Sequence, residues 1–376
     1  MIATAGINNN VLDNVLYMAM ELSQNKWCLA FGNGVKLRQV TLDSNDRLGL
    51  FEAILQAKEK LGLTNDAKVL SCYEAGRDGF WIHRFLTSEG IENIVIDSSS
   101  IKVDRKNRRA KTDRLDASQM LKQLILHVRG DDKLQIARVP SEVEEDRRRV
   151  HRERERLIKE RTGHTNRIKS LLTLFGIKFK NKGWKSWETY LTHVKSWKGE
   201  SLPEDQRAEL LREAQRLEMV ETQLKELESL RLKRLETQSE EAYKKVNLLK
   251  GLKGIGDIGA WVFVMEWFGW RQFNNRREVG AAAGLVGAPY DSGESRREQG
   301  ITKAGNYRIR TLSIELAWCW LRYQPESELS RWFNERFNQG KRSKRVGIVA
   351  LARKLLIALW RYVEAGEIPQ GAELKA

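Results

Sequence analysis

The stretch that decides the fold is Val15-Leu16-Tyr17-Met18-Ala19-Met20-Glu21, six apolar residues that end at a carboxylate. A continuous apolar run of this length is typical of a strand that is buried on both faces of a sheet. After a short turn around Asn25, residues 27–31 predict a second strand, and residues 35–42 are compatible with a third. The chain therefore begins with strand hairpins built around a buried strand.

Strand and helix patterns alternate through the rest of residues 1–137. Apolar residues at helical spacing, including Leu48, Phe51 and Ile54, predict a helix over residues 46–61. Further patterns predict a short strand over residues 67–71, a helix over 81–88 and a strand over 91–96. Strand hairpins followed by alternating strands and helices predict a mixed sheet with helices on its faces, so we expect an α/β domain here.

Two further acids lie at the end of a basic segment, Lys106-Asn107-Arg108-Arg109-Ala110-Lys111-Thr112-Asp113-Arg114-Leu115-Asp116-Ala117. Asp113 and Asp116 are three residues apart, so they would share one face of a helix. A basic segment would bind nucleic acid better without carboxylates, which suggests that these two acids have another task. Hard divalent cations bind clustered carboxylate oxygens. The segment therefore indicates metal chemistry beside a polyanion.

The complete carboxylate set is Glu21, Glu74, Asp113 and Asp116. Glu21 ends the first strand and Glu74 follows the strand predicted at 67–71, and functional groups in open α/β sheets gather at the carboxyl ends of strands. Any one of these acids alone is more simply a solvated surface residue. Four that converge could hold two Mg²⁺ (or Mn²⁺) ions for phosphodiester chemistry.

The composition favours a polyanionic partner. The chain of 376 residues has 66 Lys and Arg against 50 Asp and Glu, a formal net charge of +16. Basic residues placed against phosphates release condensed counterions, although a merely basic protein without such a partner has the same composition. Three cysteines cannot form a disulfide framework, and neither a secretory signal nor a membrane span is visible. We expect a cytoplasmic protein with no membrane partner.

Residues 138–245 are dominated by charge. Apolar residues recur there at three-to-four spacing, at Leu210, Ala214, Leu217, Leu224 and Leu227. This stripe is typical of long amphipathic helices that pair as a coiled coil, with residues 176–203 as their connection. The region could be an oligomerisation arm, a nucleic-acid clamp or an inert spacer. We favour a homo-oligomer, a dimer or a tetramer, because such a stripe needs a partner surface.

Residues 246–376 are again apolar and predominantly helical in pattern. Gly254-Ile255-Gly256 predicts a tight turn between two helices, of the helix-hairpin-helix type, in which backbone N–H groups approach a phosphate. An interhelical packing turn has the same sequence pattern. No histidine spacing for zinc and no Walker phosphate loop occurs in the chain.

A second candidate site in this region is Ser292, which precedes Gly293 in a stretch that predicts an exposed loop. A serine hydroxyl is a nucleophile when a base or a metal activates it. Basic residues follow it and would bind phosphate oxygens, as would the basic residues before Asp113. The predicted phosphate-binding side chains are Lys106, Arg108, Arg109, Lys111, Arg296, Arg297, Lys303, Arg308 and Arg310.

Taken together, these motifs resemble the insertion-sequence transposases that have an N-terminal RuvC-like domain with a DEDD carboxylate set and a C-terminal transposase domain with a serine. Relatives of that family include site-specific DNA invertases and bridge-RNA-guided recombinases. The resemblance lies in four parts: Tyr73-Glu74-Ala75-Gly76, Lys111 to Ala117, Leu252-Lys253-Gly254-Ile255-Gly256, and the long stretch with Ala283-Gly284-Leu285, Ser292-Gly293, Gly300 to Asn306 and Arg310.

The resemblance implies an RNase H-like (RuvC-like) domain over residues 1–137, a helical coiled-coil connector over 138–245, and a mainly α transposase domain over 246–376. It implies that Glu74, Asp113 and Asp116 are the second, third and fourth metal ligands, and that Ser292 attacks DNA and holds it covalently. Domains of different subunits would build a composite site. A structured non-coding RNA would pair with target and donor DNA.

The first metal ligand departs from the family pattern, which usually has Asp in a run of the Ile-Gly-Ile-Asp type. This chain has Met18-Ala19-Met20-Glu21, and the longer side chain moves the carboxylate outward by one methylene group. A displacement of about 1 Å lowers the rate in a positioned site. We expect a metal-dependent DNA transposase or site-specific recombinase. The alternatives are a junction-resolving nuclease that uses metal-activated water and a non-catalytic nucleic-acid-binding descendant.

Overall fold

The computed structural model describes residues 14–375 apart from 77–78, 99–100, 102–111, 132–133, 180–185, 293–294 and 338–339, and leaves undescribed the side chains of residues 289–292, 295–299 and 341–342. The predicted phosphate-binding residues Lys106, Arg108, Arg109 and Lys111 therefore lie outside the described residues. The chain divides into two compact units, Met1–Pro140 and Ser141–Ala376. The three domains inferred from the sequence, with boundaries at 137 and 245, stay a prediction.

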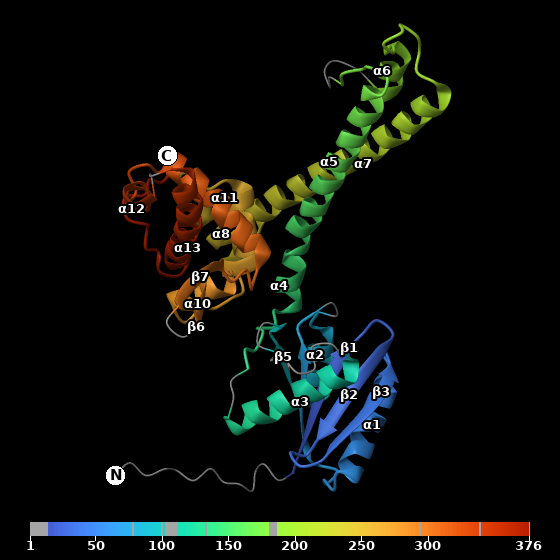
Figure 1. Cartoon of the computed structure of the whole chain (residues 1–376), viewed down its shortest axis with the longest axis vertical. Coiled ribbons are helices and arrows are strands. Elements are labelled where there is room, and N and C mark those ends of the chain that lie inside the picture. The colour runs from blue at the N-terminus through green and yellow to red at the C-terminus, as the bar shows by residue number, and fades with distance from the viewer. Residues whose placement is uncertain are drawn as a thin grey trace. The chain divides into compact units, whose positions relative to one another are not determined.

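The first unit contains a five-stranded mixed sheet with helices on both faces (Figure 1). The strand order is β3-β2-β1-β4-β5. The strands are β1 (Val15–Leu22), β2 (Lys26–Gly32), β3 (Leu37–Asp43), β4 (Lys68–Glu74) and β5 (Glu92–Ile96). β1, β2 and β3 are antiparallel neighbours, whereas β1, β4 and β5 run parallel. The predicted mixed α/β architecture of this region is confirmed.

The central strand β1 is buried on both faces, which explains its uninterrupted apolar run. Alternate side chains of a strand point to opposite faces. Leu16, Met18 and Met20 belong to the core with helices α1 (Arg47–Lys60) and α2 (Trp81–Ser88). The residues between them face α3 (Asp113–Arg129), in a second core that also contains the cysteines of β2 and β4. That core includes Val15, Tyr17, Ala19, Cys28 and Cys72.

The second unit begins with two long helices. Its first elements are α4 (Glu142–Arg147), α5 (Arg149–Thr173), α6 (Trp187–His193) and α7 (Glu204–Thr237). The helical stretch expected over residues 142–175 is interrupted at Arg148, whose buried guanidinium lies 4.8 Å from the centre of the Trp270 ring. The connection expected over residues 176–203 contains the short helix α6.

Helices α5 and α7 pack side by side and run in opposite directions (Figure 1). Leu210 and Leu217 of α7 pack in one core with Ile168 and Leu172 of α5. The apolar stripe of α7 therefore has a partner surface within its own chain. The stripe alone therefore does not require a second subunit, and the homo-oligomer stays a prediction.

The remaining elements form a helical core that includes a short hairpin. They are α8 (Glu241–Lys250), α9 (Asp257–Phe263), the π-helical turn η4 (Val264–Phe268), α10 (Arg276–Ala282), β6 (Gly287–Ser292), β7 (Ser295–Ile301), α11 (Tyr307–Tyr323), α12 (Glu328–Phe337) and α13 (Lys341–Ala365). Trp261, Trp267 and Trp320 are fully buried there. The mainly helical character is confirmed, but the hairpin β6–β7 was not predicted. Among the described residues, no helix is long and apolar enough to cross a bilayer.

Candidate functional site

Two of the predicted acids end neighbouring parallel strands. Glu21 is the penultimate residue of β1, and Glu74 is the last residue of β4. The register of these strands pairs Met20 with Tyr73. Glu21 and Glu74 each follow one of these paired residues, so the two acids lie next to each other at the carboxyl ends of their strands. This is the edge at which open α/β sheets place functional groups.

Both acids face the side of the sheet that α3 covers. Ala19 of β1 and Cys72 of β4 belong to the core beneath α3. Glu21 and Glu74 lie two residues further along their strands, and side chains two residues apart in a strand share a face. Both glutamates are partly buried. Their side chains therefore share one face of the sheet.

Helix α3 brings the other two acids to this face. Asp113 and Asp116 lie in its first turn, where the helix dipole favours negative charge. The Thr112 side chain caps the helix by accepting the backbone N–H of Leu115 at 3.4 Å. Ala117 of the same helix is buried against the sheet. Asp113 is four residues before Ala117 and lies on the same side of the helix, where it is exposed, whereas Asp116 lies directly before Ala117 and is half-buried.

The first turn of α3 is attached to the sheet by Gln39 of β3. Its side-chain amide nitrogen donates to the backbone oxygen of Arg114 at 2.6 Å and to Oγ of Ser118 at 2.7 Å. These two bonds fix where α3 begins relative to the sheet, and hence where its acids lie.

The charges of two of the four acids, Glu21 and Asp113, affect the pKa of the Cys28 thiol. Cys28 pairs with Glu21 across β1 and β2. Burial raises the pKa of the Cys28 thiol, a hydrogen bond with Thr41 and the charge of Arg114 oppose the increase, and the negative charges of Asp113 and Glu21 add to it. The charges of both carboxylates therefore raise the pKa of the same buried thiol.

These residues suit a hard divalent cation in donor type and in the face they share. Within the described part of the chain, however, no group of three or more His, Cys, Asp or Glu residues is close enough together to hold a metal ion. The structure therefore brings the four acids to one face and one end of the sheet without joining them into a metal-binding cluster.

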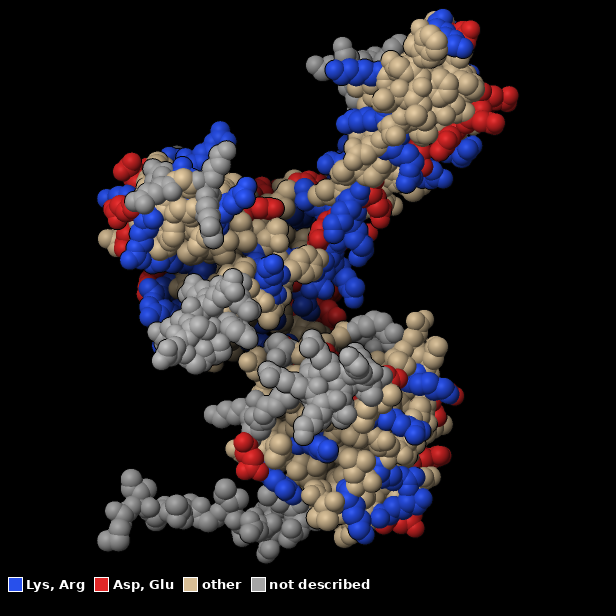
Figure 2. All heavy atoms as spheres, viewed as in Figure 1, with Lys and Arg blue, Asp and Glu red and all other residues tan. Residues whose placement is uncertain are grey.

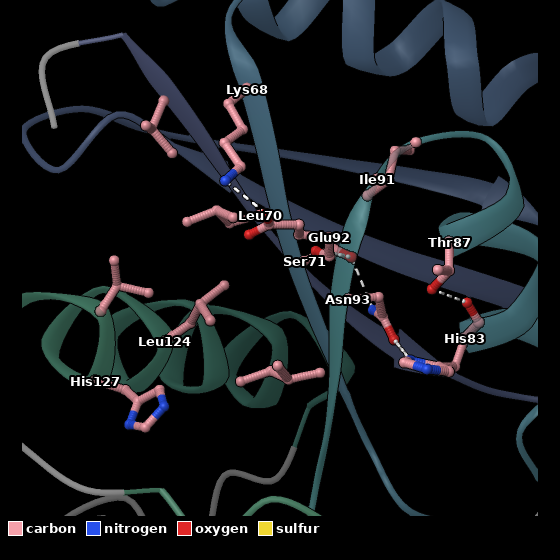
Figure 3. Close-up of a pocket in the computed structure, with 14 residues that line it drawn as sticks. Lys68, Leu70, Ser71, His83, Thr87, Ile91, Glu92, Asn93, Leu124 and His127 are labelled. Carbon is pink, nitrogen blue, oxygen red and sulfur yellow. Dashed lines mark hydrogen bonds and ion pairs between the residues drawn. The ribbon is translucent and has the colours of Figure 1, made fainter. Parts of the chain in front are cut away.

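A cavity of about 790 Å³ lies at the opposite end of the same sheet (Figure 3). It is lined by the first residues of β1, β4 and β5 and by Leu124 and His127 of α3. Asn93 accepts a hydrogen bond from Nδ1 of His83 at 2.9 Å and donates to Oγ of Ser71 at 2.7 Å. None of the predicted site residues that the structure describes lines this cavity.

Ser292 lies at the end of the hairpin in the second unit. It is the last residue of β6 and pairs with Ser295, the first residue of β7. The expectation that Ser292 lies in a loop is therefore wrong, because its backbone belongs to the strand ladder. The side chains of Ser292, Arg296 and Arg297 lie outside the described residues, so their predicted roles stay predictions.

The base of this hairpin is held by backbone hydrogen bonds between the segments that enter and leave it. The backbone N–H of Thr302 donates to the oxygen of Val286 at 2.9 Å, and that of Lys303 to the oxygen of Gly284 at 3.2 Å. Further along, the N–H of Asn306 donates to the oxygen of Ala282 at 2.9 Å. The segments 282–286 and 302–306 thus form a continuous platform below the strands.

Arg310 binds both segments of the platform. Its guanidinium donates to the backbone oxygens of Ala283 at 3.2 Å and Lys303 at 3.0 Å. A side chain at Gly284 would collide with Ala304 and with Arg310 itself, and the residue has a φ of +66°. Gly284 belongs to the motif Ala283-Gly284-Leu285, and the structure explains why this position is glycine: two backbones approach too closely for a side chain.

Two other predicted phosphate-binding cations are placed differently. Nε of Arg308 donates to a carboxylate oxygen of Glu155 at 2.7 Å, which joins α11 to α5. Lys303 is exposed and has a φ of +55°. The guanidinium groups of Arg308 and Arg310 therefore both donate hydrogen bonds to other protein groups. Their roles in phosphate binding stay predictions.

The predicted turn at Gly254 and Gly256 does connect two helices, α8 and α9. Ile255 is buried between them, whereas Gly256 is exposed. The neighbouring backbone N–H of Lys253 donates to the oxygen of Glu373, and the two side chains form an ion pair. The backbone N–H of Lys253, one of the donors of this turn, is therefore already bonded to Glu373.

The sequence reasoning missed a buried carboxylate, Glu266, in the π-helical turn η4. Its side chain is fully buried and accepts from Nε2 of His151 at 2.7 Å and from two nitrogens of Arg152 at 2.5 and 3.0 Å. Nδ2 of Asn306 lies 3.4 Å from its second oxygen. Burial raises the pKa of the Glu266 carboxyl, but the hydrogen bonds and the positive charge of Arg152 outweigh burial and hold the pKa well below its usual range.

A similar buried carboxylate occurs between the two long helices. Glu213 of α7 accepts from Nδ1 of His164 at 2.7 Å and from Arg167 at 3.0 Å, both on α5, and it is also paired with Arg216. Figure 2 shows that basic and acidic side chains are intermingled on the visible face of the α5–α7 pair. Glu213 fixes the packing of these helices, and its hydrogen-bond and ion-pair partners among the described residues all lie on α5 and α7.

Comparison with known proteins agrees with the motifs. A family model described as the transposase IS116/IS110/IS902 family matches residues 246–330. A second model, a transposase model of the IS110 DEDD type, matches residues 23–177. The chain is 40% identical over 375 residues to y4rJ of Sinorhizobium fredii (strain NBRC 101917 / NGR234), whose name describes a transposase, and the match covers 96% of this chain and 94% of the relative.

Two more distant relatives have similar names. One is y4qE of the same Sinorhizobium fredii strain, 30% identical over 258 residues, which are 68% of this chain and 60% of the relative. The other is a family 20 transposase by name, from Pseudomonas aeruginosa PAO1, 31% identical over 216 residues, which are 56% of this chain and 61% of the relative.

Proposed function

Because the chain belongs to the IS116/IS110/IS902 family of transposases, we propose that this DNA-cutting and rejoining enzyme works through a covalent bond between Ser292 and DNA. The observation that carries the proposal is the position of Ser292 at the end of a hairpin whose base is fixed by the 282–286 and 302–306 platform. A serine at the tip of such a hairpin can approach a sugar–phosphate backbone while the base stays in place.

The chemistry conserves the number of phosphoester bonds. The Ser292 hydroxyl gives up its proton, its Oγ forms a bond to phosphorus, and the bond from phosphorus to one sugar oxygen breaks. The released sugar oxygen takes up a proton. Rejoining reverses these steps with the hydroxyl of another DNA end, so the energy of the broken ester bond is kept in the serine ester and no external energy source is needed.

We further propose that the first unit is an RNase H-like (RuvC-like) domain that binds Mg²⁺ or Mn²⁺ through Glu21, Glu74, Asp113 and Asp116. The order of its mixed sheet and the shared face of the four acids support this. A bound metal would lower the pKa of an attacking hydroxyl and neutralise charge on the phosphate. The acids themselves would hold the ion beside the strand ends, and the ion would offset their repulsion of the DNA phosphates.

A structured non-coding RNA is the proposed guide. The net charge of +16 supports a large polyanionic partner, and base pairing between such an RNA and both DNA partners would supply the sequence choice. The protein would then contact phosphates rather than base edges. A homo-oligomer, a dimer or a tetramer, would allow the metal-binding unit of one subunit and the serine of another to act on the same strand.

The test is a strand-exchange assay with purified protein, Mg²⁺, DNA carrying the cognate ends, and RNA transcribed from the flanking non-coding DNA. We expect a protein–DNA adduct that resists denaturant and is lost in Ser292→Ala. Cleavage that persists in Ser292→Ala but is lost in Asp113→Ala would instead identify a nuclease that uses metal-activated water. Salt-sensitive binding without any strand breakage would identify a non-catalytic nucleic-acid-binding protein.

A further inference from the structure

The buried carboxylate Glu266 connects two segments that are far apart in the sequence. On one side it accepts hydrogen bonds from His151 and Arg152 of α5. On the other side, Nδ2 of Asn306 lies 3.4 Å from its second oxygen. The carboxylate itself sits in the π-helical turn η4, an irregularity that is frequent at functional sites. Glu266 therefore joins α5 to the segment that leaves the hairpin.

Asn306 has three structural tasks at this point. Its Oδ1 accepts the backbone N–H groups of Arg308 and Ile309, which caps the first turn of α11. Its own N–H donates to the oxygen of Ala282, which closes the platform below the hairpin. Its remaining donor faces Glu266. The orientation of Asn306 thus sets both the start of α11 and the base of the hairpin.

A second contact between α5 and α11 supports the same arrangement. Glu155, one turn after His151, accepts from Nε of Arg308 at 2.7 Å and from the hydroxyl of Tyr307 at 3.3 Å. Residues four apart on a helix lie on one face, so α5 presents His151 and Glu155 together toward the C-terminal elements. The hairpin platform is therefore held by a helix that starts more than a hundred residues before it.

We propose that Glu266 is a positioning residue for DNA cleavage. It holds Asn306 through its second oxygen, and Asn306 holds the platform from which the Ser292 hairpin extends. The proposal rests on the function proposed above for Ser292. It assigns to Glu266 no contact with DNA and no proton transfer, only the placement of the hairpin relative to α5.

A carboxylate is needed here because one group must accept from several donors at once. Two carboxylate oxygens offer about four acceptor sites, whereas a glutamine side chain offers one oxygen and presents two N–H groups of its own. In Glu266→Gln, one nitrogen of Arg152 and the amide of Asn306 would face an N–H group. The platform would then lose its fixed position, although the side-chain volume is unchanged.

The experiment compares Glu266→Gln with Glu213→Gln. Glu213 is the matched control, because it is also a buried carboxylate bound by a histidine and an arginine of α5, but it lies away from the hairpin. For each full-length variant, the rate of covalent adduct formation is measured at saturating DNA, together with DNA affinity and thermal unfolding. A fluorophore-labelled DNA carrying the cognate ends is the probe.

We expect Glu266→Gln to slow adduct formation at saturating DNA by about tenfold or more, with little change in DNA affinity, because misplacement of a reacting group acts on the chemical step. Glu213→Gln is expected to lower the unfolding temperature and to form the adduct at the parental rate. A parental adduct rate in Glu266→Gln, or an equal loss in both variants, would overturn the proposal.

Two further measurements keep the test decisive. If Glu266→Gln does not fold, Arg152→Lys keeps the positive charge at a partly exposed position but loses the two-nitrogen contact, and the same loss of adduct rate is expected. If the parent chain forms no adduct at all, the proposed serine chemistry fails, and amide hydrogen exchange decides the inference alone. Faster exchange at Thr302, Lys303 and Asn306 in Glu266→Gln supports it, and unchanged exchange there refutes it.

Discussion

The backbone N–H of Asn306 donates to the carbonyl oxygen of Ala282 at 2.9 Å, and Gly305 makes this approach possible. Gly305 has a φ of +120°, and a Cβ at this position would collide with the same oxygen of Ala282. The two segments that flank the hairpin are therefore in backbone contact, with no space for a side chain between them.

The first prediction concerns this contact. Gly305→Ala should lower the free energy of unfolding by about 3 kcal/mol, because the new side chain needs both a left-handed backbone and a separation of the two segments. Gly163→Ala, in the middle of α5 with open space around it, should instead raise stability by about 1 kcal/mol. Urea denaturation of both variants checks this, and a neutral Gly305→Ala would contradict the contact.

The second prediction concerns the acids of the first unit. Mg²⁺ should raise the unfolding temperature of the chain, because an ion that binds only the folded state stabilises it. The increase should disappear in Asp113→Asn and in Glu74→Gln. Glu92→Gln is the control, since Glu92 pairs with Lys68 at the other end of the sheet. A full Mg²⁺ response in Asp113→Asn would show that the ion binds elsewhere.

The third prediction separates the two possible tasks of Arg308. If its guanidinium binds phosphate, Arg308→Ala should weaken DNA binding and reduce the slope of log affinity against log salt by roughly 1. Glu155→Gln removes the partner of Arg308 and not the cation, so DNA affinity should be kept or increased. Fluorescence anisotropy over a range of salt concentrations measures both. Equal losses in the two variants would assign Arg308 to structure alone.

The fourth prediction concerns acid stability. The pKa of Glu266 in the folded chain lies below its ordinary value of 4.5, so its ionised form stabilises the fold above that pH. This contribution is lost as the pH falls below about 4.5 toward the lower folded pKa. The difference in unfolding free energy between the parent and Glu266→Gln should therefore be largest near neutral pH and shrink on acidification. A difference that grows on acidification would contradict the charged assignment.

The sequence was most informative where a strand is buried on both faces. The apolar run from Val15 and the helical spacing around Phe51 predicted β1 and α1 to within about two residues, because burial requires those residue types at those intervals. It also placed Asp113 and Asp116 together on a helix, and the structure has both in the first turn of α3. The hairpin escaped prediction because β6 and β7 have no apolar alternation, as in Ser295–Ile301.

The candidate site, too, could be predicted only in part from the sequence. Glu21 and Glu74 could be predicted at the carboxyl ends of strands, and the register shows that these two strands are adjacent. One feature of the sequence pointed to Glu266: it is the single acidic residue within the apolar residues 258–270. Its partners His151 and Arg152 could not be identified from sequence, because they lie over a hundred residues away and no periodic pattern links them.

The different burial of the three cysteines has a practical consequence. Cys28 and Cys72 are buried beneath α3, and Cys319 on α11 is exposed. Burial raises the pKa of both inner thiols, which keeps them protonated, and maleimides react with the accessible thiolate. The unaltered chain should thus accept one fluorophore, at Cys319. That dye would sit on the helix capped by Asn306 and would report in real time whether α11 moves when nucleic acid is added.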